Sequence, residues 1–166
     1  MKKLLLLDAD VVIDLHTLGI FERVSKAYKV SLTEKVFSEA KFYPRGNQNF
    51  PIRLKGKVRV IRDIQTKYLR VVNDEEREAR LRIGPGEATS IAYLLQSSEE
   101  VIFCTCDKTA MRLISFMNLE EKAISLEKAL KDIGYSGRLF SRHREEEFKK
   151  EISEGKTLRI WYKNLK

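Results

Sequence analysis

Residues 3–13 read Lys-Leu-Leu-Leu-Leu-Asp-Ala-Asp-Val-Val-Ile, and this stretch decides the fold class. A short apolar run that ends at a polar residue is typical of a strand buried on both faces of a parallel sheet. The run Val101–Cys106 has the same form and ends at Asp107. Helical periodicity follows each run. Strands that alternate with helices predict an α/β fold with a mainly parallel central sheet.

Hydrophobic spacing and capping residues predict the remaining elements on either side of these two runs. Helices are expected over 11–28 with a break at Gly19, and over 34–42, 74–82, 87–96, 108–116, 126–133 and 142–153. Short strands are expected over 29–32, 58–61 and 123–125. Pro and Gly residues predict a loop over 43–51. Residues 158–162 are expected to form an edge strand or a docked tail.

The composition is that of an ordinary folded protein: 166 residues, 43% hydrophobic and 34% charged. This length predicts one domain, residues 1–166, in which 137–166 form a C-terminal extension without an assigned role. No segment approaches the roughly 20 apolar residues of a membrane span. The N-terminal apolar run stops at Asp8, so we expect a cytoplasmic protein with no membrane partner. Cys104 and Cys106 are expected to be buried and reduced.

Four acidic residues stand where a parallel α/β fold would turn them toward one cleft. Asp8 and Asp107 follow the two apolar runs directly, and the carboxyl ends of parallel strands line the ligand crevice. Glu87 opens a helix after a Gly-Pro-Gly turn, and Glu39 lies on a short helix after the second strand. Carboxylates held together repel each other unless a cation neutralises them. The pattern therefore predicts a Mg²⁺ or Mn²⁺ site.

The net charge of +8 is concentrated in one part of the chain. Residues 41–72 hold nine basic residues against one acid, Asp63. A basic block beside an acidic cleft suits a polyanionic substrate; a solvated basic face is the alternative. The candidate nucleic-acid-binding residues are Lys41, Arg45, Arg53, Lys55, Lys57 and Arg59. The aromatic residues that could stack on unpaired bases are Phe42, Tyr43, Phe50 and Tyr68.

Four segments, taken in order, resemble the PIN-domain family of metal-dependent nucleases. They are residues 7–13 (Leu-Asp-Ala-Asp-Val-Val-Ile), 36–40 (Val-Phe-Ser-Glu-Ala), 84–92 (Gly-Pro-Gly-Glu-Ala-Thr-Ser-Ile-Ala) and 105–110 (Thr-Cys-Asp-Lys-Thr-Ala). The resemblance covers about residues 3–130. It implies a three-layer α/β/α fold around the mainly parallel sheet.

The resemblance also implies roles for individual residues. One or two Mg²⁺ or Mn²⁺ ions would be held by the catalytic acids Asp8, Glu39, Glu87 and Asp107. Asp10 would add a ligand or a hydrogen bond to one, and Thr105 matches a hydroxyl residue that relatives carry two positions before the last acid. The implied activity is endonucleolytic hydrolysis of single-stranded RNA, by a toxin opposed by an antitoxin protein or by an RNA-processing enzyme. A homodimer is a further expectation.

The expected chemistry follows from the ligands. A metal-bound water attacks phosphorus, and a second ion would stabilise the departing oxygen. His16 and His143 are both read as isolated, so metal-bound hydroxide or a carboxylate takes the role of general base. Three other acids are read as ordinary solvated charges, namely Asp14, Glu34 and Asp63.

Two other functions fit parts of the sequence. Asp8-Ala9-Asp10 after a strand matches the nucleophile signature of haloacid-dehalogenase-like phosphatases, in which Asp8 would attack phosphorus. That class leaves Glu39 and Glu87 without a role. The second alternative is a non-catalytic RNA-binding or partner-binding module of the same fold, for which the basic block would suffice.

Overall fold

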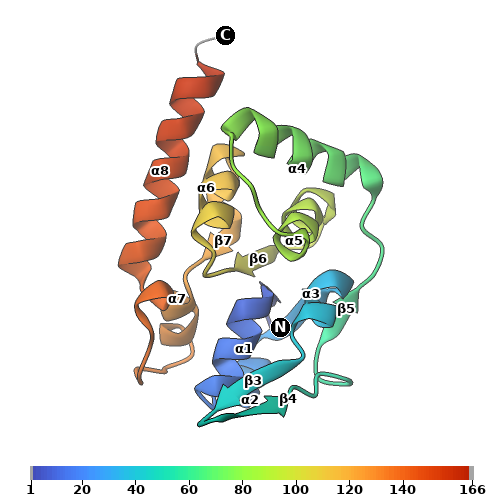
Figure 1. Cartoon of the computed structure of the whole chain (residues 1–166), viewed down its shortest axis with the longest axis vertical. Coiled ribbons are helices and arrows are strands. Elements are labelled where there is room, and N and C mark those ends of the chain that lie inside the picture. Colours follow the sequence, from blue (N-terminus) through green and yellow to red (C-terminus); the bar gives the residue numbers. More distant parts are fainter. Residues whose placement is uncertain (1, 165–166) are drawn as a thin grey trace.

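The computed structural model describes residues 2–164, and its centre is a five-stranded sheet (Figure 1). Every neighbouring pair of strands in this sheet runs parallel. The strands lie in the order β5 (Arg59–Ile61), β2 (Lys29–Thr33), β1 (Leu4–Leu7), β6 (Val101–Cys104) and β7 (Ala123–Ile124). The α/β class and the parallel sheet predicted from the sequence are therefore confirmed.

Strand β1 lies in the middle of the sheet and is buried on both faces. Leu5 and Leu7 pack into the core on one face, while Leu4 and Leu6 pack into the core on the other. Successive side chains of a strand point to opposite faces, so a wholly apolar strand must have both faces covered. Each buried leucine contributes about 1.5–3 kcal/mol.

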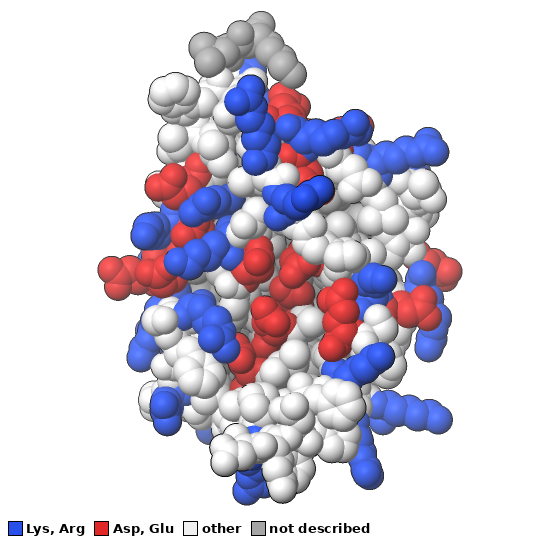
Figure 2. Space-filling model, viewed as in Figure 1, with Lys and Arg blue, Asp and Glu red and all other residues white. Residues whose placement is uncertain are grey.

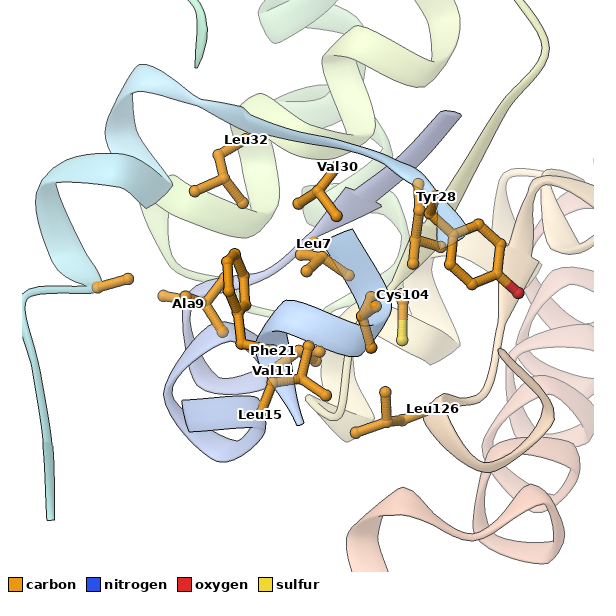
Figure 3. Close-up of a cluster of buried hydrophobic side chains, with 14 of the residues drawn as sticks. Leu7, Ala9, Val11, Leu15, Phe21, Tyr28, Val30, Leu32, Cys104 and Leu126 are labelled. Atoms are coloured by element: carbon orange, nitrogen blue, oxygen red, sulfur yellow. The ribbon is translucent and has the colours of Figure 1, made fainter. Parts of the chain in front are cut away.

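One face of the sheet is covered by α1 (Ala9–Thr17), α2 (Phe21–Ala27) and α7 (Leu126–Lys131). Figure 3 shows side chains of these helices, among them Leu15 and Leu126, in one cluster with strand residues such as Leu7 and Val30. Gly19, at φ +69°, separates α1 from α2 because this left-handed conformation is strained for other residues. The break predicted at this glycine is confirmed. Cys104 lies in this core, and both cysteines are free and buried as expected.

The other face is covered by α4 (Thr66–Ala79), α5 (Pro85–Gln96) and α6 (Lys108–Phe116). The long helix α8 (Glu145–Lys163) packs along α6 (Figure 1). The short helix α3 (Glu34–Glu39) follows β2, and the two 3₁₀ turns span Glu120–Lys122 and Ser141–His143. The three-layer α/β/α arrangement is confirmed. No helix within residues 2–164 combines the length and the apolar character that a bilayer crossing requires.

The loop predicted over residues 43–51 is wrong, because this segment forms an antiparallel hairpin of β3 (Phe42–Arg45) and β4 (Gln48–Pro51). The two Pro residues are tolerated because a two-stranded ribbon leaves one edge of each strand without ladder bonds. Tyr43 and Phe50 face each other across the strands with ring centroids 5.9 Å apart. The hairpin also ends α3 three residues earlier than predicted, at Glu39.

Two further predictions of secondary structure are wrong. Asp74 does not begin a helix but lies inside α4, which starts at Thr66 and ends with Arg80 in the left-handed conformation. For residues 158–162 the edge strand is wrong, whereas the alternative of a docked tail is confirmed, since they belong to α8 and pack against the core. Leu158 and Tyr162 are one helical turn apart and both pack against the second core. Their spacing of four residues fits a helix face as well as it fits alternation in a strand.

Candidate metal centre

Asp8 leaves the carboxyl end of β1 beside Thr105, which follows β6. The two strands are parallel with Leu7 opposite Cys104, so the next residue of each emerges at the same edge of the sheet. The Thr105 hydroxyl donates to Asp8 Oδ2 (2.9 Å), and the amide of Ala9 donates to Asp8 Oδ1 (2.8 Å). Both oxygens of this buried carboxylate are therefore held in place.

Asp107 is tied to the same group through Thr105. The Asp107 amide donates to Thr105 Oγ1 (3.1 Å), and Asp107 Oδ1 accepts from the Ala110 amide (2.6 Å) as the N-cap of α6. This bond is the capping role that a strand-to-helix Asp commonly has. The other oxygen, Oδ2, is left for further contacts at the carboxyl edge.

Glu39 and Glu87 approach the edge from two helices that meet there. Glu87 lies in the first turn of α5, where the helix dipole favours negative charge. A Cβ added to Gly86 would lie 2.6 Å from Glu39 Oε2, a separation that real Cβ atoms essentially never show. A side chain at this position would displace the flexible Glu39 carboxylate from the first turn of α5.

Four of the carboxylates share one electrostatic environment. Burial raises the pKa of Asp8 to about 7, reinforced by the charges of Glu87 and Asp10 and opposed by the hydrogen bonds from Thr105 and Ala9. The pKa of Glu39 is raised by burial, then by Glu87 and Asp10, and is lowered by Lys35. Figure 2 shows acidic side chains gathered in the middle of the face seen in Figure 1, with basic side chains around them.

The five acidic side chains of this site are buried to different extents. Asp8 is 1% exposed and forms the floor, Glu87 and Asp107 are half-buried, and Asp10 and Glu39 are exposed. The structure thus brings every acid predicted for the metal site to one edge of the sheet. Hard carboxylate oxygens with open access to water are the donors that Mg²⁺ and Mn²⁺ use, so this donor set fits the predicted ion.

The carboxylate oxygens of the predicted acids do not lie close together around a single point. Among residues 2–164, only Asp14, Cys106 and His143 form a group of three whose possible ligand atoms lie within 4.8 Å of one another. Like charges in a partly buried site separate in the absence of a cation. A divalent ion would therefore have to draw the carboxylates closer together.

The group of Asp14, Cys106 and His143 corrects two sequence predictions. Asp14 is not a solvated charge but is 5% exposed, and His143 is not isolated but is 1% exposed. His143 Nε2 lies 2.7 Å from Asp14 Oδ2. Arg142 donates from Nε (2.9 Å) and Nη2 (2.6 Å) to the two oxygens of the same carboxylate. Residues 129 positions apart carry no local sequence signal of such a contact.

Hydrogen bonds already occupy the groups that a metal would need here. The Phe140 amide donates to His143 Nδ1 (3.2 Å), so Nε2 carries the proton and donates to Asp14. Burial raises the pKa of the Cys106 thiol far above its usual range, which keeps it protonated. Burial also raises the pKa of Asp14, but the bonds from His143 and Arg142 outweigh it and the net pKa is lowered. This group is a hydrogen-bonded brace between α1 and the C-terminal extension.

The six candidate nucleic-acid-binding residues do not lie together beside the acids. Arg59 begins β5, at the amino edge of the sheet, and donates to Glu99 (2.7 Å). Lys57 forms an ion pair with Glu22 and shares a pocket with Arg53 near the C-terminal end of α1. Lys55 is exposed in the turn before β5. The remaining two are both exposed: Lys41 directly precedes β3, and Arg45 is its last residue.

Other basic residues lie close to the acids, and sequence reasoning missed them. Lys35 on α3 lowers the pKa of Glu39. Lys108 opens α6 directly after Asp107, and its ammonium pairs with Glu147 (3.3 Å) and Glu151 (4.0 Å) of α8. The hydrogen bond to Asp14 raises the pKa of Arg142, and the charge of Asp10 adds to this effect. These residues are scattered along the sequence, so no composition window could have shown that they share a site.

Comparisons with known proteins leave the family open: no family model, no curated protein and no solved structure matches this chain.

Proposed function

We propose that this protein is a Mg²⁺- or Mn²⁺-dependent endoribonuclease that hydrolyses single-stranded RNA. The observation that carries the proposal is the meeting of Asp8, Asp10, Glu39, Glu87 and Asp107 at the carboxyl edge of a parallel sheet. Burial, reinforced by the charges of Glu87 and Asp10, raises the pKa of Asp8 to about 7, which is costly unless the charge has a use. The preference for RNA rests on the resemblance of the four sequence segments to PIN-domain nucleases.

The proposed role of each acid follows from how deeply it is buried. Asp8, fixed by Thr105 and Ala9, presents its carboxylate from the floor without rotational freedom. Asp107 and Glu87, half-buried, and Glu39, at the rim, would complete the ligand set. A bound ion would supply an activated water and neutralise charge on the phosphate. Lys35, whose charge acts on Glu39, favours the approach of a polyanion.

The test is cleavage of a labelled single-stranded RNA in the presence of Mn²⁺. We expect Asp8→Asn and Asp107→Asn to lose at least about 100-fold in rate, since each removes a charged ligand from a site that works by charge stabilisation. Asp74→Asn is the matched control, because Asp74 is exposed on α4 and, among residues 2–164, pairs only with Arg77. Cleavage at the wild-type rate by Asp8→Asn would rule out the proposal.

One observation favours a second candidate, a non-catalytic RNA-binding module. The predicted ligand atoms in residues 2–164 are spread beyond the 4.8 Å grouping that a formed ion site would show. Calorimetric titration with Mn²⁺ separates the two functions. Binding that disappears in Asp8→Asn supports the nuclease, whereas RNA binding with no metal uptake and no cleavage supports the module.

A further inference from the structure

A groove begins at Asp10 and runs along the outer face of α1, leading away from the acidic edge. Its floor is one helix face, formed by Asp10, Ile13, Asp14 and Thr17 at helical spacing, and its volume is about 380 Å³. Pro44 of the hairpin forms one wall, and the wall opposite is formed by Phe140 and Arg142. Asp10 belongs both to this groove and to the acid group, so the two are continuous.

Arg142 is the cation of this groove, and its position is fixed from one side. Its Nε and Nη2 hold the buried Asp14, while Asp14 is fixed in turn by His143. Its guanidinium also lies over the ring of Phe140, 4.8 Å from the centroid. Even so, the side chain stays 48% exposed, and within the described part of the chain Nη1 makes no hydrogen bond.

We propose that this groove holds the RNA strand next to the scissile phosphate, and that Arg142 binds the phosphate of a neighbouring nucleotide. The inference rests on the proposed function and identifies a binding subsite of the same site. A guanidinium has five N–H donors, and a carboxylate that takes two of them leaves one edge for a phosphate. Because Asp14 has already ordered the side chain, binding loses little further conformational entropy.

A purely structural brace would not require this exposure. The contact between His143 and Asp14 would by itself join α1 to the extension, and both residues are buried. Arg142 adds two bonds to the same carboxylate yet keeps its free edge toward the groove, 48% exposed. The C-terminal extension thereby supplies a cation beside Asp10, in a groove whose other charged lining residues are Asp10 and Asp14.

The experiment measures RNA binding without turnover, by fluorescence anisotropy in an Asp8→Asn background. The probe is a labelled single-stranded RNA of about 12 nucleotides, titrated over a series of salt concentrations. We expect Arg142→Gln to raise Kd about tenfold and to reduce the salt slope by about 0.7, the value of one phosphate contact on a single strand. Arg142→Lys should keep the salt slope, because the positive charge remains. It should lose part of the affinity, because an ammonium cannot donate two parallel hydrogen bonds to a phosphate as a guanidinium can.

The matched control is Arg144→Gln. Arg144 lies two residues away, is 51% exposed and pairs with Glu127 (3.4 Å) outside the groove, so Kd and slope should stay as they were. Thr17→Glu tests the groove without disturbing the Arg142 pair, since Thr17 is exposed and its hydroxyl donates to the Ile13 carbonyl of its own helix. It should weaken binding relative to Thr17→Gln. This comparison decides the matter if Arg142→Gln proves unstable in urea.

The outcomes separate the two proposals. Unchanged affinity and slope in both Arg142→Gln and Thr17→Glu would overturn the groove, while metal-dependent cleavage by the wild-type protein would leave the proposed function standing. Absence of RNA binding by every variant, together with absence of cleavage by the wild-type protein, would remove both.

Discussion

Replacing Asp8 by Asn should stabilise the metal-free protein at neutral and alkaline pH. The folded state raises the pKa of Asp8 from 3.8 to about 7, because the carboxylate is buried beside Glu87 and Asp10. Between these two values the folded state binds more protons than the unfolded state, so stability falls as pH rises. Below pH 4 the group is protonated in both states and costs nothing. Above pH 7 the full cost of the charge is present.

The magnitude follows from the same numbers. A rise from 3.8 to about 7 corresponds to about 4 kcal/mol, at about 1.4 kcal/mol per pKa unit. This is an upper value, because the site relaxes and water enters around the exposed acids Asp10 and Glu39. We therefore expect a gain of about 2–4 kcal/mol for Asp8→Asn at pH 8. For a protein of this size it corresponds to an increase in Tm of about 5–15 °C.

The assay is urea denaturation in EDTA at pH 8 and at pH 4.5, with wild type and variant compared at each pH. The advantage of Asp8→Asn should be largest at pH 8 and should shrink toward zero at the lower pH. Added Mn²⁺ should narrow the difference at pH 8, because the ion stabilises only the protein that keeps the charged ligand.

Asp14→Asn supplies a control of opposite sign. Asp14 is also a buried acid of this region, but the bonds from His143 and Arg142 lower its pKa. Its contribution to stability is present above its ordinary pKa and is lost as pH falls through the lowered value. The substitution should cost about 1–3 kcal/mol at pH 8. If Asp8→Asn proved no more stable than wild type in EDTA at pH 8, the electrostatic account of the acid site would be wrong.

Three further predictions concern metal, packing and the basic residues. Mn²⁺ at a hundred times its Kd should raise the wild-type Tm by about 5–10 °C in differential scanning fluorimetry; no change at millimolar Mn²⁺ would contradict a competent site. Gly155→Ala places a Cβ against the backbone of Arg112, so overpacking of about 1–3 kcal/mol should exceed the helix-propensity gain of about 1 kcal/mol. The urea midpoint of Gly155→Ala should lie below that of Glu154→Ala, a substitution at an exposed position. Equal midpoints for the two variants would refute the close contact. Arg59→Glu at the amino edge should weaken RNA binding less than Arg142→Gln, and an equal or larger loss would place RNA there.

Local sequence patterns were sufficient where the physics is local. The leucines of β1 alternate between two cores, so an apolar run of four could be read as a buried strand without knowledge of its neighbours. Asp8 and Asp107 follow strands that the fold class places in parallel, and this alone sends them to the same edge. The hairpin over 42–51 was missed because the aromatic pairing of Tyr43 with Phe50 stabilises it despite two prolines.

The sequence by itself determined the alternation of strands and helices, the parallel sheet and the acids at its carboxyl edge, because these depend on periodicity and on the direction of the chain. Tertiary structure alone decided which charges are buried and which cations meet the acids. Asp14 and His143 are 129 residues apart, and their burial depends on how the C-terminal extension docks against α1. Charge state and contact across such distances depend on the surrounding packing, which no local window of sequence contains.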